Sequence, residues 1–158
     1  MKKLAKEIKQ KRPFESLEAE AILNLQRTTD QILRRSQQAF KAHGLTGPQY
    51  NALRILRGAQ PHGLACSEIG RRMISHDPDI TRLLRRLEGM KLTAHTRDVR
   101  DRRVVFTRIT TAGLQKLAEM DPLVNKETRK ALGHMSADRL ALLVDLLEEA
   151  RQAPGGPS

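Results

Sequence analysis

The sequence has few of the residues that stabilise small proteins through cross-links or large aromatic cores. It contains 158 residues, of which one is cysteine, none is tryptophan and 3% are aromatic. A single cysteine, Cys66, cannot form an internal disulfide, and structural disulfides are rare in reducing compartments, so we expect a cytoplasmic protein. With so few aromatic residues the core must be mainly aliphatic, and such a set of residues favours helices.

Sequence motifs for membrane insertion, catalysis and metal binding are also absent. No apolar run approaches the ~20 residues of a membrane-spanning helix, and no apolar stretch of a secretory signal follows the basic start MKKLAKEIKQKR. The chain has no glycine-rich phosphate loop, no nucleophile beside a base and no paired acids. Its five histidines are scattered without ligand spacing. We therefore expect a protein that is not an enzyme and that needs no metal or cofactor.

Positive charge is what the sequence has in excess. Lysine and arginine number 29 against 18 aspartates and glutamates, which leaves a net charge of +11. A surface so basic favours a polyanionic partner, with nucleic acid first and an anionic membrane surface second. The length suits one domain over residues 1–158, because two separate cores would each be marginal. The tail 153–158, APGGPS, is expected to be disordered.

Hydrophobic periodicity and turn residues predict a mainly helical protein with one small β-hairpin. Helices are predicted at 16–43, 48–57, 67–73 and 78–89, the last beginning after Asp77 and ending at Gly89. Two segments rich in Thr, Val, Phe and Ile, 92–97 and 104–110, are predicted to pair as a hairpin. Thr110 caps another helix, and the C-terminal third is helical in two pieces that are separated around 130–136.

The predicted helix at 78–89 carries the first functional signal. Four apolar residues repeat at helical spacing, namely Ile80, Leu83, Leu84 and Leu87. If this stripe faces the core, the other side presents one hydroxyl and three guanidinium groups, from Thr81, Arg82, Arg85 and Arg86. Such a helix can bind guanine edges or phosphates, and a short helix before it would make a helix-turn-helix. The competing interpretation is a solvated basic face.

The loop of the predicted hairpin carries the second signal. It reads DVRDRR and projects three cations, Arg100, Arg102 and Arg103, beyond the body of the protein. A minor groove of negative potential could receive one of them. Asp101 would be repelled by phosphate, so we interpret it as a brace that holds a neighbouring arginine. Exposed charge pairs without a binding role are the alternative here.

Three motifs connect these signals to a known family. They are Leu45-Thr-Gly-Pro-Gln in the second helix, Asp77-Pro-Asp-Ile-Thr-Arg-Leu at the basic helix, and Asp101-Arg102-Arg103 followed by Ile109, Thr110 and Gly113. With them the chain resembles the MarR family of winged-helix transcriptional regulators over nearly its whole length. The resemblance implies a homodimer on double-stranded DNA, with dimerisation helices in 14–43 and 111–152. It also implies a winged helix-turn-helix lobe in 45–110 that reads a pseudo-palindromic operator.

The resemblance also implies roles for single residues. Arg82 would contact bases, while Thr81, Arg85 and Arg86 would contact bases or phosphates. Ser67 would bind a phosphate at the start of the short helix. In the wing, Arg103 would enter the minor groove beside Arg100 and Arg102, and Asp101 would brace it. The chain departs from the family at Asp79, where a small hydroxyl residue is common, and at Ala65, where a capping threonine is frequent.

Regulation by a small molecule is a further expectation from the resemblance. In the family an effector, often an anionic aromatic compound, binds between the DNA-binding lobe and the dimerisation helices. Candidate anion partners on the first long helix are Arg27, Arg34, Arg35 and Lys41. Cys66 lies outside that helix, so we expect a small, half-buried residue rather than a redox sensor.

A second functional class remains open from the sequence. A basic helical module could bind RNA, a membrane surface or an acidic protein without reading sequence. A general polyanion binder would spread its arginines, whereas this chain gathers them on one predicted helix and one loop. That clustering favours a dimeric DNA-binding repressor, with no membrane partner.

Overall fold

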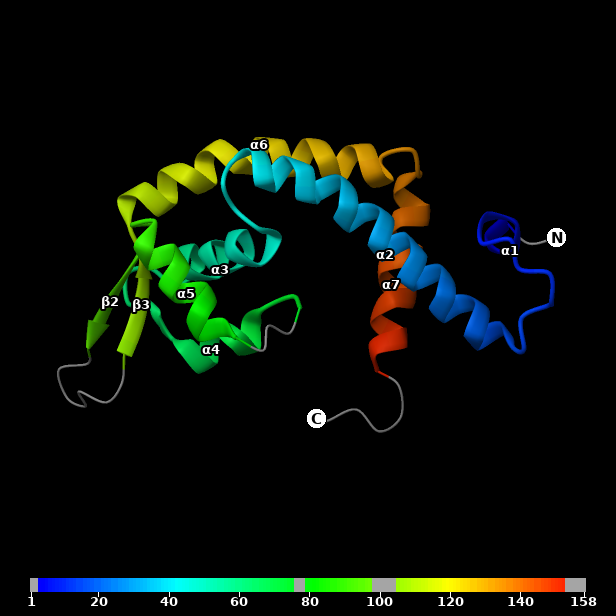
Figure 1. Ribbon diagram of the computed structural model, residues 1–158, viewed down its shortest axis with the longest axis horizontal. Coiled ribbons are helices and arrows are strands. Elements are labelled where there is room, and N and C mark those ends of the chain that lie inside the picture. The colour runs from blue at the N-terminus through cyan, green and yellow to red at the C-terminus, as the bar shows by residue number, and fades with distance from the viewer. Residues whose placement is uncertain (1–2, 76–78, 98–104, 153–158) are drawn as a thin grey trace. The chain divides into compact units, whose positions relative to one another are not determined.

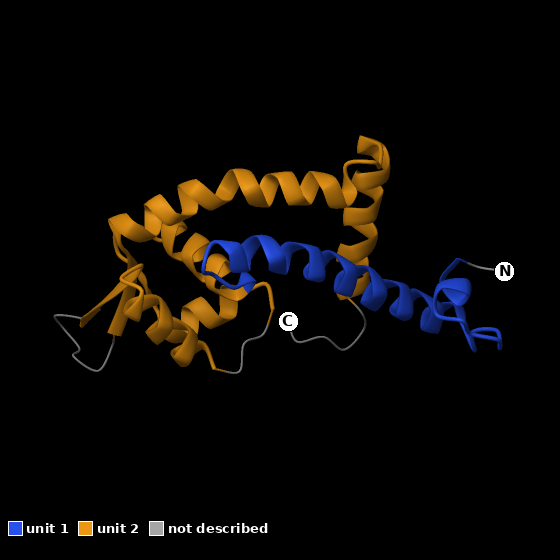
Figure 2. Ribbon diagram, turned by 45° about the horizontal axis from the view of Figure 1, so that its top comes forward, with its two compact units in different colours: residues 1–47 blue, residues 48–158 orange. Residues whose placement is uncertain are grey.

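A computed structural model describes residues 3–75, 79–97 and 105–152 (Figure 1). The chain forms two compact units, residues 1–47 and residues 48–158, which are coloured separately in Figure 2. The predicted wing residues Arg100, Asp101, Arg102 and Arg103 lie outside the described residues.

Over its described residues, 3–47, the first unit contains two helices, α1 (Lys3–Glu7) and α2 (Leu17–Ala42). Ser16 begins α2, because its hydroxyl accepts a hydrogen bond from the Ala19 amide at 3.1 Å. The helix ends before Gly44, whose φ of +72° is one that glycine adopts without strain. The long helix predicted at 16–43 is therefore confirmed. The short α1 was not predicted from the sequence.

The second unit contains five helices, counted over the described residues. They are α3 (Gly47–Gly58), α4 (Cys66–Arg72), α5 (Ile80–Gly89), α6 (Thr111–Leu132) and α7 (Ala137–Arg151). The side chains buried most completely here are aliphatic or Met, apart from one threonine: Leu53, Leu56, Ile69, Leu87, Leu117, Met120 and Thr107. These side chains come from α3, α4, α5, α6 and β3, so these elements share one mainly aliphatic core.

A three-stranded antiparallel sheet completes the second unit. Strand β3 (Val105–Ile109) lies between β1 (Leu64–Ala65) and β2 (Thr93–Arg97). The predicted hairpin is confirmed as β2 and β3, but β1 was missed. Gly63 allows β1 to approach, because its φ is +76° and a Cβ there would lie 2.4 Å from the Thr107 carbonyl oxygen.

The start of α5 differs from the prediction. Asp79 is the N-cap, and its Oδ1 accepts a hydrogen bond from the Arg82 amide at 3.0 Å. The helix therefore begins at Ile80, two residues later than predicted, and Asp77, expected to precede it, lies outside the described residues. Gly89 is the last helical residue, as predicted, but the left-handed residue after the helix is Lys91, with φ of +60°.

Candidate nucleic-acid interface

Helix α5 has one buried side and one basic side. Leu83, Leu84 and Leu87 are buried in the core, and Ile80 is half-buried. The side chains predicted to face outward are all exposed, namely Thr81, Arg82, Arg85 and Arg86. The stripe that packs α5 on the unit therefore leaves three guanidinium groups in solvent, where they can reach a phosphate or a base edge.

Asp79 has a clear structural role at the start of α5. Its carboxylate caps the helix through the Arg82 amide, and a negative charge at a helix N-terminus is also favoured by the helix dipole. The departure from the family's hydroxyl residue thus keeps the capping function. Because the same bond fixes the backbone of Arg82, it also orients the first arginine of the basic side.

Helix α4 lies beside the beginning of α5. Cys66, the first residue of α4, is half-buried as expected, and its Sγ is 3.8 Å from the Thr81 hydroxyl. Ser67 follows it and is exposed. Ala65 is the N-cap position and supplies no side-chain hydrogen bond. The structure therefore brings Ser67 and Thr81, predicted from separate segments, to neighbouring helix starts.

One acidic residue on α4, Glu68, holds the two arginines at its C-terminal end. Glu68 accepts a hydrogen bond from Arg72 Nε at 2.7 Å and pairs with Arg71 as well. The hydrogen bond from Arg72, together with the charge of Arg71, lowers the pKa of the Glu68 carboxyl. These two arginines are thus oriented on the surface of α4.

Helix α3 stabilises the helix-turn-helix through a hydrogen bond to the turn after α4. Asn51 Oδ1 accepts a hydrogen bond from the Ile74 amide at 2.9 Å, which holds the turn that follows α4. Ile74 itself is 90% exposed. Sequence analysis assigned no role to Asn51, because a single asparagine in a helix gives no local signal of a tertiary contact.

A polar cluster connects α3 to α6, and we call Tyr50, Arg57 and Asp121 the Asp121 cluster. The Tyr50 hydroxyl donates to Asp121 Oδ1, and Arg57 Nη1 donates to Oδ2, both at 2.6 Å. Burial, followed by the hydrogen bond to Asp121, raises the pKa of Tyr50 to about 12. Burial alone would raise the pKa of Asp121, but the hydrogen bonds from Tyr50 and Arg57 outweigh it and lower that pKa.

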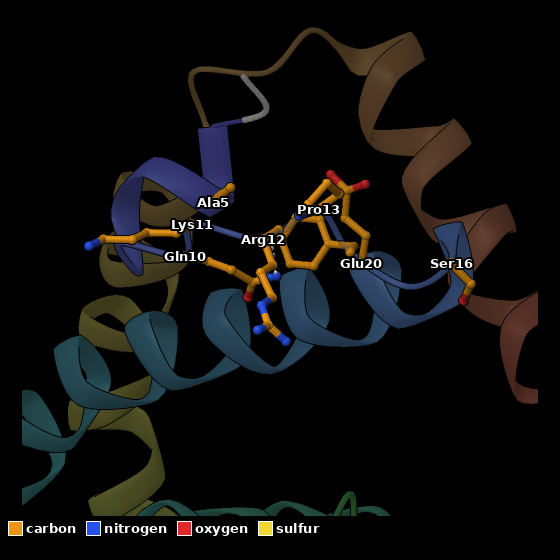
Figure 3. A pocket seen from close by; sticks show the side chains of 8 residues that line it. Ala5, Gln10, Lys11, Arg12, Pro13, Ser16 and Glu20 are labelled. Carbon is orange, nitrogen blue, oxygen red and sulfur yellow. Dashed lines mark hydrogen bonds between the residues drawn. The ribbon is translucent and has the colours of Figure 1, made fainter.

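The candidate effector residues lie on α2, in the first unit. Arg34 Nε is 3.0 Å from Asp30 Oδ1, so part of its charge is already balanced. A cavity of about 360 Å³ lies at the other end of this unit, and Figure 3 shows the side chains around it. It is lined by Ala5, Gln10, Lys11, Arg12, Pro13, Phe14, Ser16 and Glu20. None of the predicted effector residues lines this cavity.

The described part of the chain has neither a metal-binding cluster nor a membrane-spanning helix. No group of three or more His, Cys, Asp or Glu side chains there is arranged to hold a metal ion. Among the same residues, none of the helices has the length and apolarity needed to cross a membrane.

The sequence and the structure of this chain both match those of one known family. The model of the MarR family matches residues 45–105. The chain is 40% identical to a MarR transcription factor from Planctomyces limnophilus, whose crystal structure superposes with a TM-score of 0.68 and covers 86% of this chain and 98% of that one.

Two other relatives extend the match. The HTH-type transcriptional regulator TtmR from Methylorubrum extorquens is 34% identical over 109 residues, which are 69% of this chain and 54% of TtmR. BpsR from Bordetella bronchiseptica is 23% identical and has the same fold, with a TM-score of 0.76 over 90% of this chain and 99% of BpsR.

The mainly helical fold and the three-stranded wing sheet agree with these relatives. The expected family and fold are therefore confirmed. Regulators of this family are not enzymes, as the absence of catalytic motifs indicated. The chain belongs to the MarR family of DNA-binding, winged helix-turn-helix transcriptional regulators.

Proposed function

We propose that the protein is a homodimeric repressor that reads a pseudo-palindromic operator and is released from DNA by a small anionic aromatic effector. The observation that carries the proposal is the basic side of α5, which is exposed directly opposite the buried Leu83, Leu84 and Leu87. The buried leucines anchor the helix, so its guanidinium groups already lie in solvent and can bind DNA without any rearrangement of the core.

In this proposal α5 is the recognition helix and lies in the major groove. Arg82 contacts base edges, because it lies in the first turn, where recognition helices reach the bases. Thr81, Arg85 and Arg86 contact neighbouring bases or phosphates. Ser67 binds a backbone phosphate, a role supported by its exposure at the start of α4.

The wing completes the DNA contacts. Strands β2 and β3 lead to residues 98–104, and we propose that Arg103 from this loop enters the minor groove. Arg100 and Arg102 add phosphate contacts, and Asp101 braces the arginines. A narrow minor groove attracts arginine through its negative potential, which suits a loop with three cations.

Dimerisation is proposed through the helices in 14–43 and 111–152. Apolar side chains of α2 and α7 are exposed in the single chain: Leu17, Ile22, Leu23, Leu25, Leu33, Leu142, Val144 and Leu146. No residue of α7 is buried. So much exposed apolar surface supports a partner, and a second copy would place two recognition helices on half-sites about 34 to 36 Å apart.

Ligand response is proposed by analogy with BpsR, whose DNA binding is regulated by 6-hydroxynicotinic acid, an aromatic acid. Candidate partners for an effector carboxylate are Arg27, Arg34, Arg35 and Lys41. An effector would release DNA by favouring a dimer geometry in which the two recognition helices no longer fit their half-sites.

The test is a competition experiment with the purified full chain. A labelled duplex from the region upstream of the protein's own gene is challenged with unlabelled operator or scrambled duplex, at two salt concentrations. We expect the operator to compete more strongly at both concentrations, because base contacts are less sensitive to salt than phosphate contacts are. Equal competition would favour a basic module without sequence readout.

A further inference from the structure

His95 lies where three elements of the second unit meet. It is in β2, directly opposite Thr107 of β3, and Glu88 lies in the last turn of α5 beside it. The imidazole Nδ1 is 3.1 Å from Thr107 Oγ1, and Nε2 is 3.2 Å from Glu88 Oε2. Each ring nitrogen therefore contacts a different element of the helix-turn-helix and its wing sheet.

The two contacts of the ring respond differently to protonation. Thr107 is 1% exposed, and its hydroxyl can donate to a neutral ring or accept from a protonated one. The Glu88 side chain is 45% exposed and that of His95 is 29% exposed. Glu88 accepts a hydrogen bond from a neutral ring that carries its proton on Nε2, and this contact becomes an ion pair only when the ring is protonated.

Few other charges face this ring. On α5, Arg85 lies three residues before Glu88, and on β2, Arg97 follows His95 by two residues on the same face of the strand. The residues that β3 pairs with this face of β2 are neutral, namely Val105, Thr107 and Ile109. Glu88 is therefore the carboxylate that the imidazole contacts within the described residues.

We propose that His95 is a positioning residue for DNA binding, which fixes the angle between the recognition helix and the strands of the wing by bridging Glu88 and Thr107. The inference rests on the proposed role of α5 as the recognition helix. Helix and wing must engage one duplex together, so a small change of angle between them moves the guanidinium groups of one away from their contacts. Protonation strengthens the bridge and tightens operator binding.

The test compares variants that keep or remove each part of the bridge. His95→Gln keeps a side-chain N–H that can reach Glu88 but cannot become charged, whereas His95→Phe removes both ring nitrogens. Glu88→Gln removes the carboxylate, and the exposed His134, in the turn between α6 and α7, provides the matched control His134→Gln. Operator and scrambled-duplex affinities of the full chain are measured at pH 5.5 and pH 8.5 and constant salt.

At pH 5.5 we expect His95→Gln and Glu88→Gln each to weaken operator binding about two- to fivefold, as for a partly exposed ion pair. The double variant should be no weaker than either single variant, because each change removes the same ion pair between His95 and Glu88. At pH 8.5 His95→Gln should bind like the wild type, while His95→Phe stays weaker. His134→Gln should match the wild type at both values.

Three results would overturn the role of His95. The first is additive losses in the double variant. The second is a pH effect of His95 that persists in Glu88→Gln, since this would be a simple charge effect on DNA. The third is coupling between the two residues in thermal stability but not in operator affinity. Arg82→Ala, run in parallel, tests the recognition helix separately: if it keeps the operator preference, the placement of α5 fails whatever the His95 variants do.

Discussion

The Asp121 cluster allows the sharpest prediction about stability. Asp121→Asn keeps the shape of the side chain but removes its charge and replaces one acceptor with an N–H₂ donor. Tyr50 and Arg57 both donate to this carboxylate at 2.6 Å. In the variant, either the Tyr50 hydroxyl or Arg57 Nη1 therefore faces the N–H₂ group of the asparagine, which cannot accept its hydrogen bond.

The magnitude follows from the two bonds and their exposure. A hydrogen bond to a charged group contributes about 1.5–3 kcal/mol. The side chains of Asp121 and Arg57 are 31% and 38% exposed, so solvent screens part of this interaction. We expect a loss of about 2 kcal/mol in the free energy of unfolding, which lowers Tm by ~4 to 8 °C for a chain of this size.

The pH dependence gives a second readout for the same variant. The pKa of Asp121 is lowered in the folded state, so its contribution is present above the pKa of an unfolded aspartate, about 3.9. It is lost as pH falls through the lower pKa of the folded state. The stability difference between wild type and variant should be constant from about pH 5 to 8 and shrink below ~4.

A matched control lies in the first unit. Asp30 also pairs with an arginine, Arg34, but at i,i+4 on the exposed surface of α2. Asp30→Asn should cost no more than about 0.5 kcal/mol. Thermal and urea unfolding are compared at one protein concentration, since a dimer's Tm depends on it. If Asp121→Asn is no more destabilising than Asp30→Asn, the structural importance assigned to the cluster is refuted.

Four further predictions concern single side chains. The raised pKa of Tyr50 means that the wild type loses stability as pH rises from ~10 toward 12, because the folded state favours the neutral phenol. Tyr50→Phe should remove this loss, and alkaline unfolding that is the same in both proteins would contradict the assignment. Asp79→Ala should cost about 1 kcal/mol in chemical unfolding through loss of the α5 cap, and a cost near zero would count against that bond. Arg82→Ala should reduce discrimination between operators by ~1 to 3 kcal/mol in competition binding, and intact sequence preference would show that α5 is misplaced. Arg103→Ala should weaken binding to all duplexes and lower the slope of log affinity against log salt by about 1, whereas a loss confined to one sequence would contradict a minor-groove contact made through charge alone.

Local sequence pattern was enough to predict helices whose apolar stripe or capping residue lies within the helix itself or next to it. The stripe Ile80, Leu83, Leu84, Leu87 predicted both the helix and which side of it is exposed, because helical geometry alone places residues three and four apart on one face. Ser16 and Thr110 likewise predicted helix starts that the structure confirms through their capping bonds. These interactions lie within one turn of the chain.

Interactions between distant segments left no comparable signal. Strand β1 has two residues, too few for alternation to be visible, and it forms because Gly63 fits against the backbone of Thr107. The partners of Asp121 lie 71 and 64 residues away in sequence. The start of α5 was predicted two residues too early, after Asp77, because Asp79 is also an aspartate that precedes the same apolar stripe and residue type does not distinguish them.

The sequence by itself determined the class of this protein. Its aliphatic periodicity, its net charge of +11 and the clustering of arginines pointed to a helical DNA-binding regulator, because each of these depends only on composition or on near neighbours. The tertiary structure decided how the parts of the DNA-binding lobe support one another. Asn51 holding the turn after α4, the Asp121 cluster joining α3 to α6, and His95 between α5 and β3 are contacts that exist only once packing brings remote segments together.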